Sequence, residues 1–401
     1  MITLNDIKEA KNKLDGVIQK TPLTYAPILS NELNSNIYVK KENLQITGSF
    51  KIRGAFNKLS LLSQEQRDEG VVAASAGNHA QGLAYSAQYF NCNSTIFMPE
   101  ATPLTKVSGV KSYGAEVILK GANYDESYEL ATSYAKQNNK HFIHPFADDS
   151  VIAGQGTIAL EILEEVNDFD CLVVPIGGGG LISGVAIAAK AINPNIKIIG
   201  VVASGAPAMK ESFEMHLPID STAVKTIADG IAVRDVTPKM LDYVLEHVDE
   251  IVEVEDQEIA NAILFLLEKQ KLVVEGAGAV SVAAAMHNKI DVEDKKVALI
   301  LSGGNIDVTM LSLIIEKGLV KSSRKMNLLV TLMDKPGALM HLTNIFKACD
   351  ANIVQIDYDR NSVKLEFGEA HVTIALETKG KEHQNTIREN LKQNGYRFKQ
   401  I

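Results

Sequence analysis

The chain has 401 residues, a length typical of two to three domains. Hydrophobic residues make up 46% of the sequence, charged residues make up 22%, and the formal net charge is -9. This composition is that of a globular protein and excludes a disordered or collagen-like chain. Binding to nucleic acid through its phosphates requires clustered Lys and Arg, so the acidic balance argues against that function.

Cysteine usage and hydrophobic patterning indicate the compartment. Cys92, Cys171 and Cys349 are too far apart for a disulfide framework or a metal-ligand spacing, so we expect a protein of the reducing cytoplasm. The N-terminus lacks the apolar core of a signal peptide. Residues 171–189 carry no charge and are long enough to span a membrane, but Pro175 and four glycines would break a lipid-exposed helix. We therefore expect a buried strand, a glycine turn and a buried helix there, and no membrane partner.

The first 320 residues alternate short apolar runs with longer helical patterns. This alternation predicts an α/β fold, with parallel strands covered by helices on both faces. The expected strands cover residues 36–41, 70–74, 94–98, 116–119, 171–175, 196–202 and 296–301. The expected helices cover residues 50–62, 81–90, 103–112, 124–137, 156–165 and 181–191.

The C-terminal part of the chain has a different order of elements. The basic stretch KSSRK indicates a linker at residues 321–326, and the charged C-terminus of a helix is an alternative that is compatible with a linker. The remaining residues, 327–401, predict a smaller α+β domain of the ferredoxin-like order β-α-β-β-α-β. Its expected elements are strand 327–332, turn 334–337, helix 338–349, strands 352–357 and 371–377, helix 382–394 and strand 396–399.

Lys51 is the first candidate for chemistry. It follows Thr47, Gly48 and Ser49, whose composition is typical of a helix cap, so it is expected in the first turn of a helix, where the dipole disfavours a cation. A lone lysine is most often a solvated surface group. A buried lysine with a lowered pKa, however, can form a Schiff base with a carbonyl compound.

The sequence SAGNH, residues 75–79, follows a predicted strand and opens a predicted helix. Ligands of open α/β sheets bind at this edge, and the N–H groups of a helix start suit a carboxylate. Ordinary turn chemistry for Asn78 and a satisfied histidine for His79 remain alternatives.

Two further turns follow buried strands. Four consecutive glycines, residues 177–180, allow several backbone N–H groups to approach an anion at a helix N-terminus, which predicts a phosphate site. They match neither GxGxxG nor a Walker motif. Ser302 places a hydroxyl at the end of strand 296–301, where a plain turn is the alternative.

The motifs GSFKIRGA, SAGNHAQG, VPIGGGGLISG, IADGIAV, VVEGAGA and SGGNID occur in this order. Together they resemble the β-family, or fold type II, of pyridoxal-phosphate enzymes, and within it the threonine ammonia-lyases, also called threonine dehydratases. The resemblance covers about the first 320 residues and implies two parallel-sheet subdomains, the smaller at about residues 41–145.

The resemblance implies a role for each candidate residue. Lys51 would hold pyridoxal 5'-phosphate and then act as the base at the substrate Cα atom. The other cofactor-binding residues would be Phe50 at the pyridine ring, Asn78 at the 3-hydroxyl, Gly177, Gly178, Gly179 and Gly180 at the phosphate, and Ser302 at the pyridine nitrogen. The substrate carboxylate would be bound by Ser75, Gly77, Asn78 and His79. Gly230 and Glu275 lie in motifs that line the pocket, and no metal site is expected.

The implied activity is that of a carbon–nitrogen lyase. It would eliminate water from L-threonine to give 2-oxobutanoate and ammonia, and convert L-serine to pyruvate, in isoleucine biosynthesis or threonine catabolism. Three alternatives stay open: a serine racemase, whose second serine base is replaced here by Ala76, a β-replacement enzyme of the same fold, and a non-catalytic amino-acid sensor.

The C-terminal residues resemble an ACT regulatory domain, with Asp334, Pro336, Gly337, Leu339 and Asn352 at its motif positions. Such a domain implies control by a small amino acid, here isoleucine or valine. One copy per chain implies pairing between chains, and therefore a homodimer or a homotetramer.

Overall fold

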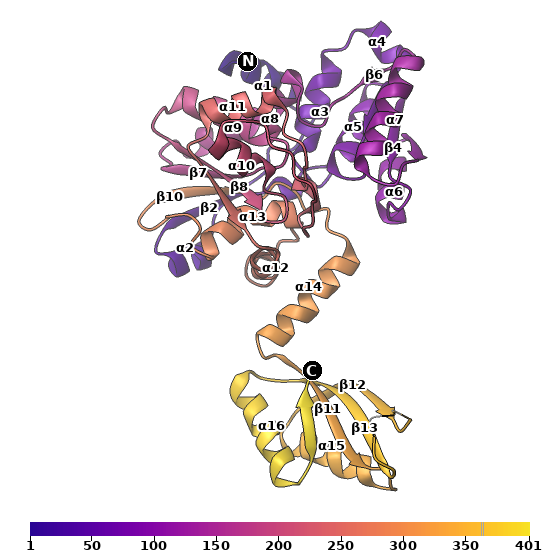
Figure 1. The fold of residues 1–401 in the computed structure, drawn as a ribbon. Coiled ribbons are helices and arrows are strands. Elements are labelled where there is room, and N and C mark those ends of the chain that lie inside the picture. Colours follow the sequence, from indigo (N-terminus) through magenta and orange to yellow (C-terminus); the bar gives the residue numbers. More distant parts are fainter. Residues whose placement is uncertain (362, 364) are drawn as a thin grey trace. The chain divides into compact units, whose positions relative to one another are not determined.

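The computed structural model describes residues 1–361, 363 and 365–401. The chain forms two compact units, Met1–Ile306 and Asp307–Ile401 (Figure 1). The first unit contains two sheets that are parallel apart from one strand pair, and the second contains one antiparallel sheet. None of the described helices combines the length and apolar character needed to cross a membrane.

The larger sheet of the first unit has the strand order β1-β2-β10-β7-β8-β9. Its strands are β1 (Leu23–Tyr25), β2 (Asn36–Lys40), β7 (Cys171–Pro175), β8 (Lys197–Ala203), β9 (Glu250–Val254) and β10 (Lys296–Ile300). All neighbours are parallel except β1 and β2. The early strand β2 and the late strand β10 therefore lie side by side.

Helices cover both faces of this sheet (Figure 1). They are α1 (Leu4–Leu14), α2 (Pro27–Leu33), α8 (Asp149–Glu165), α9 (Gly180–Ile192), α10 (Ala208–Met215), α11 (Pro238–His247), α12 (Asp256–Phe265) and α13 (Gly276–Met286). Short single-turn helices lie at Glu42–Leu44, Asp229–Ile231 and Leu266–Gln270. One apolar core joins α8, α9 and α11 to the sheet, and α13, which is buried almost along its whole length, lies on the other face.

The smaller sheet has the order β5-β4-β3-β6, and all its strands are parallel. The strands are β3 (Val71–Ala74), β4 (Ser94–Met98), β5 (Glu116–Leu119) and β6 (His141–Phe142). The helices of this subdomain are α3 (Lys51–Ser60), α4 (Gln64–Glu69), α5 (Asn78–Tyr89), α6 (Leu104–Lys111) and α7 (Tyr124–Gln137). Strand β3 alternates between two cores: Val71 and Ala73 pack with α3 and α5, whereas Val72 and Ala74 pack with α7.

The second unit has the predicted β-α-β-β-α-β order after one additional helix. Its elements are α14 (Val308–Lys321), β11 (Lys325–Met333), α15 (Ala338–Ala348), β12 (Asn352–Asp359), β13 (Glu369–Glu377), α16 (Lys381–Gln393) and β14 (Arg397–Gln400). The antiparallel sheet has the order β12-β13-β11-β14. Alternate residues of β11 are buried against α15 and α16, which explains why its pattern is easy to recognise.

Most predicted bounds lie within one to three residues of those in the structure, and two boundaries differ more substantially. Residues 321–326, predicted as a linker, contain the end of α14 and the start of β11, and α14 belongs to the second compact unit. Helix α8 begins at Asp149, capped by the Asp148 carboxylate, and not at residue 156. A glycine inside it, Gly154, marks a close approach, since a Cβ atom there would lie 2.5 Å from the carbonyl oxygen of Arg53.

Candidate active site

The segment before α3 is joined directly to the turn after β10. The N–H of Phe50 donates to the carbonyl oxygen of Ser302 at 3.1 Å, and the N–H of Gly304 donates to that of Gly48 at 2.8 Å. Both Phe50 and Ser302 are buried. The structure therefore places the first and fourth predicted segments in contact.

Lys51 is the first residue of α3, where the sequence predicts it. Its side chain is half-buried, and its Nζ atom donates to the carbonyl oxygen of Pro145 at 3.0 Å. Burial lowers the pKa of Lys51 to about 8, although the Glu275 carboxylate opposes this shift. Lys51 therefore has far more neutral, nucleophilic amine at neutral pH than a solvated lysine has.

The acceptor of Lys51 belongs to a turn that no sequence motif indicates. The Nδ1 atom of His144 accepts the N–H of Phe146 at 3.2 Å and the N–H of Ala147 at 2.9 Å. Burial and the nearby Lys51 charge lower the pKa of His144 to about 4, so its ring is neutral and Nδ1 stays an acceptor. His144 thus orients the turn that presents the Pro145 carbonyl to Lys51.

The four glycines form a loop, residues 177–180, between β7 and α9. A Cβ atom on Gly178 would lie 2.5 Å from the Phe146 ring, and one on Gly177 would lie 2.9 Å from the Cα atom of Ile231. Within the described part of the chain, the N–H groups of Gly177, Gly178 and Gly179 have no acceptor. Open N–H groups at a helix start fit the phosphate of pyridoxal 5'-phosphate.

The loop SAGNH leads from β3 into α5. Asn78 is the first residue of α5, and Gly77 at the N-cap has no side chain with which to cap the helix. The first N–H groups of a helix have no intrahelical acceptor, so they suit a carboxylate. The N–H of Gly77 already donates to the Oγ atom of Ser75 at 3.2 Å. The N–H groups of Asn78 and the residues after it are therefore the main anion donors here.

The structure restricts the role predicted for His79. Its buried Nε2 atom donates to the carbonyl oxygen of Ile143 at 3.0 Å. Burial and the Lys51 charge lower the pKa of His79 to about 3, so the ring is neutral and Nδ1 carries no proton. The His79 side chain has no N–H left for a carboxylate, and His79 can bind one only through its backbone.

Glu275 and Asn305 join the site through Asn78. The Nδ2 atom of Asn78 donates to Oε1 of Glu275 at 2.6 Å, and Nδ2 of Asn305 donates to Oδ1 of Asn78 at 2.7 Å. Burial and Asp229 raise the pKa of Glu275 to about 7. The sequence signal for Glu275 is weak: a single carboxylate in the apolar run VVEGAGA.

A buried ion network holds α3 in place. The Arg53 guanidinium binds Glu42 through two hydrogen bonds of 2.8 Å and also binds Glu161 through bonds of 2.6 and 2.9 Å. The Nζ atom of Lys40 donates to Glu161 at 2.5 Å. Two cations and two carboxylates balance here, so the start of α3 is tied to β2 and α8 without a net buried charge.

Comparisons with known proteins show the family to which this chain belongs. The family model described as "Pyridoxal-phosphate dependent enzyme" matches residues 14–303. An L-threonine ammonia-lyase of Thermotoga maritima is 49% identical over 396 residues, which cover 99% of this chain and 98% of that protein. The solved structure of maize serine racemase has a TM-score of 0.75 at 34% identity, covering 80% of this chain and 98% of the other. The solved structure of the processed form of threonine deaminase isoform 2 from Solanum lycopersicum has a TM-score of 0.74 at 38% identity, covering 78% of this chain and 86% of the other.

Proposed function

This chain belongs to the family of pyridoxal-phosphate dependent enzymes, and from that premise we propose that it is an L-threonine ammonia-lyase. It eliminates water from L-threonine, and uptake of one water by the released enamine gives 2-oxobutanoate and ammonia; L-serine gives pyruvate and ammonia in the same way. The observation that carries the proposal is the half-buried Lys51 amine, whose pKa is lowered to about 8 and which lies in a site with an open glycine loop.

Pyridoxal 5'-phosphate, when bound, supplies the electron sink that stabilises negative charge at the substrate Cα atom. The glycine loop, residues 177–180, would hold its phosphate, Phe50 would pack against its ring, and Ser302 would face its ring nitrogen. The free amine of Lys51 removes the Cα proton, because a neutral amine in this pH range is a competent general base. The N-terminus of α5 binds the substrate carboxylate and so orients the Cα–H bond.

A racemase needs a second base on the face of the substrate opposite to Lys51. Position 76 is an alanine in this chain, and it offers no hydroxyl between Ser75 and Gly77. The chain nevertheless resembles maize serine racemase, so this alternative needs a test. Formation of D-serine from L-serine would support it.

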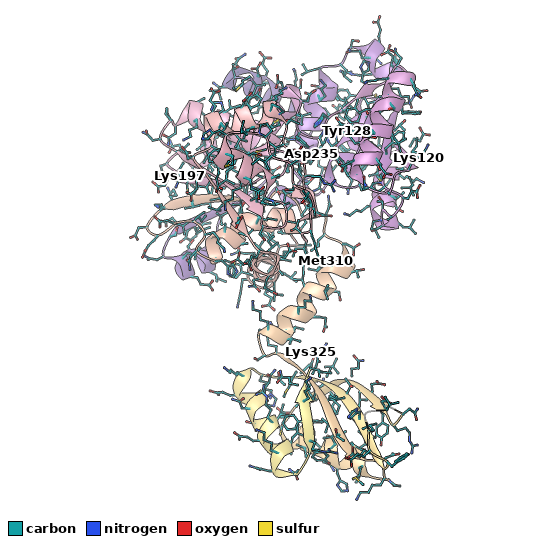
Figure 2. All side chains as sticks on the ribbon, in the orientation of Figure 1. Lys120, Tyr128, Lys197, Asp235, Met310 and Lys325 are labelled. Atoms are coloured by element: carbon teal, nitrogen blue, oxygen red, sulfur yellow. The ribbon has the colours of Figure 1, made fainter. Side chains whose placement is uncertain are left out.

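The deciding experiment measures 2-oxo acid release from L-threonine and L-serine. We expect the full-length protein to form 2-oxobutanoate from L-threonine and the Lys51→Ala variant to lose this activity by at least about a thousandfold, as for loss of a catalytic base and nucleophile. Lys197→Ala is the matched control, because Lys197 is exposed at the start of β8 (Figure 2). A fully active Lys51→Ala variant would contradict the proposal, and an inactive protein that binds the cofactor would point to β-replacement or an amino-acid sensor.

We further propose that the C-terminal residues, 327–401, act as an ACT-type regulatory domain that binds isoleucine or valine where two chains pair. The element order and the sheet order support this reading. Strand β12 is an edge strand with exposed Val354, Ile356 and Tyr358, which supports pairing into a homodimer or homotetramer. The wide spacing of the three cysteines supports a cytoplasmic protein.

Removal of the residues after Lys321 tests the regulatory proposal. The shortened chain is expected to retain lyase activity and to lose its response to isoleucine or valine. Full-length protein measured with and without each amino acid is the control. An unchanged response in the shortened chain would place the effector site in the first unit.

A further inference from the structure

The side-chain amide of Asn78 is held from two sides. Its Oδ1 atom accepts the N–H of Asn305 at 2.7 Å, and its Nδ2 atom donates to Glu275 at 2.6 Å. Asn305 also donates to the carbonyl oxygen of Thr47 at 2.8 Å. These bonds connect the segment before Lys51, the turn after β10, the start of α5 and the loop before α13.

The direction of every bond in this chain follows from its two ends. The carbonyl oxygen of Thr47 can only accept, so the amide nitrogen of Asn305 must face it. The same Asn305 nitrogen donates to Asn78, so the Asn78 oxygen faces Asn305 and the Asn78 amide nitrogen faces an oxygen of Glu275. Rotating the Asn78 amide by half a turn would oppose two acceptors at one end and two donors at the other. The arrangement therefore leaves Asn78 with one orientation and one unused N–H.

The Glu275 carboxylate has no local structural task. Glu275 is the N-cap residue of α13, but its side chain makes no capping hydrogen bond. The carboxylate is buried and lies against Gly303, where a Cβ atom would come within 2.3 Å of its Oε1 atom. The backbone N–H of Glu275 donates to the carbonyl oxygen of the same glycine at 3.1 Å. The backbone therefore leaves room for the carboxylate and directs it at Asn78.

We propose that Glu275 is the positioning residue of Asn78: it accepts one Asn78 N–H, and so directs the other to the oxygen on C3 of the bound cofactor. The inference rests on the proposed function, because it assumes that pyridoxal 5'-phosphate binds in this site with Asn78 beside its C3 oxygen. Glu275 itself does not touch the reacting atoms. Its effect is on cofactor affinity, and it depends on the C3 oxygen.

The test compares two ligands that differ only at C3. Full-length protein freed of cofactor is titrated with pyridoxal 5'-phosphate and with 3-deoxypyridoxal 5'-phosphate, and the two Kd values are read from absorbance and fluorescence. Glu275→Ala is expected to weaken binding of the first ligand about tenfold and of the second by less than about twofold, since loss of one oriented hydrogen bond affects only the ligand that accepts it. Glu275→Gln keeps an acceptor oxygen and is expected to stay within about threefold of the wild type for both.

Glu253→Ala is the matched control, because Glu253 is an exposed residue of β9. If Glu275→Ala does not fold, Glu275→Met takes its place, since it fills a similar volume without an acceptor. Equal weakening of both ligands would assign Glu275 a purely structural role and overturn the inference, as would unchanged Kd values. Failure of the wild-type protein to bind either ligand would instead refute the proposed function.

Discussion

The side-chain amine of Lys51 donates a hydrogen bond of 3.0 Å to the carbonyl oxygen of Pro145, a residue of a different segment of the same unit. A carbonyl oxygen holds the amine in place without giving it a negative partner at hydrogen-bond distance. This explains how the pKa of Lys51 stays low, at about 8, in a half-buried site that also contains the Glu275 carboxylate.

Replacement of His144 tests the turn that presents this carbonyl. His144→Leu leaves the half-buried N–H groups of Phe146 and Ala147 without their acceptor, at a cost of about 1 kcal/mol in the free energy of unfolding for each group, the low end of the range for buried groups. We expect lower stability in urea unfolding and about tenfold slower 2-oxobutanoate release, as for loss of a hydrogen bond that orients a catalytic group. His144→Asn retains an acceptor and should recover part of both. Equal behaviour of the two variants would show that the Nδ1 acceptor is unimportant.

The pH dependence of cofactor incorporation reports the Lys51 pKa directly. Only the neutral amine attacks a carbonyl carbon, so the rate of incorporation into cofactor-free protein should rise with pH through about 8 and level off above it. The Glu275 charge raises the Lys51 pKa, so the midpoint should move to lower pH in Glu275→Gln. Asp229 and Lys106, the other charges near Glu275, are the same in wild type and variant, so the shift of the midpoint reports the Glu275 charge. A midpoint near the ordinary lysine value of 10.5 would contradict this account of burial.

The glycine loop can be tested with one methyl group. In Gly178→Ala the new Cβ atom would lie 2.5 Å from the Phe146 ring, so the loop must shift and its N–H groups lose their common direction. We expect cofactor affinity to fall at least about tenfold, which corresponds to about 1.4 kcal/mol. Gly109→Ala in α6 is the control, because its nearest neighbour lies 3.9 Å away and alanine favours a helix. Similar affinities for the two variants would argue against the loop as the phosphate site.

The buried network around Arg53 should dominate the stability of the first unit. Arg53→Met leaves Glu42 and Glu161 buried with unbalanced charge, so the free energy of unfolding should fall by about 3–5 kcal/mol. Lys11→Ala, which removes an exposed ion pair with Glu164 on the same helix as Glu161, should cost less than about 1 kcal/mol. Urea unfolding of both variants checks the contrast, and similar losses would contradict it.

Much of the fold can be predicted from the sequence, and the exceptions have physical causes. Strands β4, β5 and β7 have the predicted bounds. Strands β4 and β7 are buried apolar runs between turn residues, whereas β5 is only partly buried and is marked by the apolar run VIL. No strand is predicted from the sequence at β1, β6 or β9. Strands β1 and β6 have only two or three residues and leave no periodic pattern, and β9, with the sequence EIVEV, has two glutamates among its five residues. The sequence predicts too late a start for α8, because glycine in a helix resembles a break, whereas Gly154 is required by the close approach of α3.

The candidate site was predictable where a motif concentrates unusual residues. Lys51 stands out because a cation is disfavoured at a helix start, and the glycine loop because four glycines cost backbone entropy; Asn78 stands out in a turn between a strand and a helix. In the structure, hydrogen bonds connect Lys51 and Asn78 to other segments of the site. The part played by His144 depends on a turn whose acceptor is 94 positions from its donor. The neutral state of His79 depends on burial. Neither property is visible in a single sequence.

The strand order of the larger sheet has a consequence for synthesis of the protein on the ribosome. Strand β10, which ends at Ile300, pairs with both β2 and β7, so these two strands have no neighbour on that side until about three quarters of the chain has been made. The smaller sheet uses only residues between Val71 and Phe142 and can form early. The nascent chain therefore exposes apolar strand edges for a long period, and chaperones that cover such edges should raise the yield of folded protein.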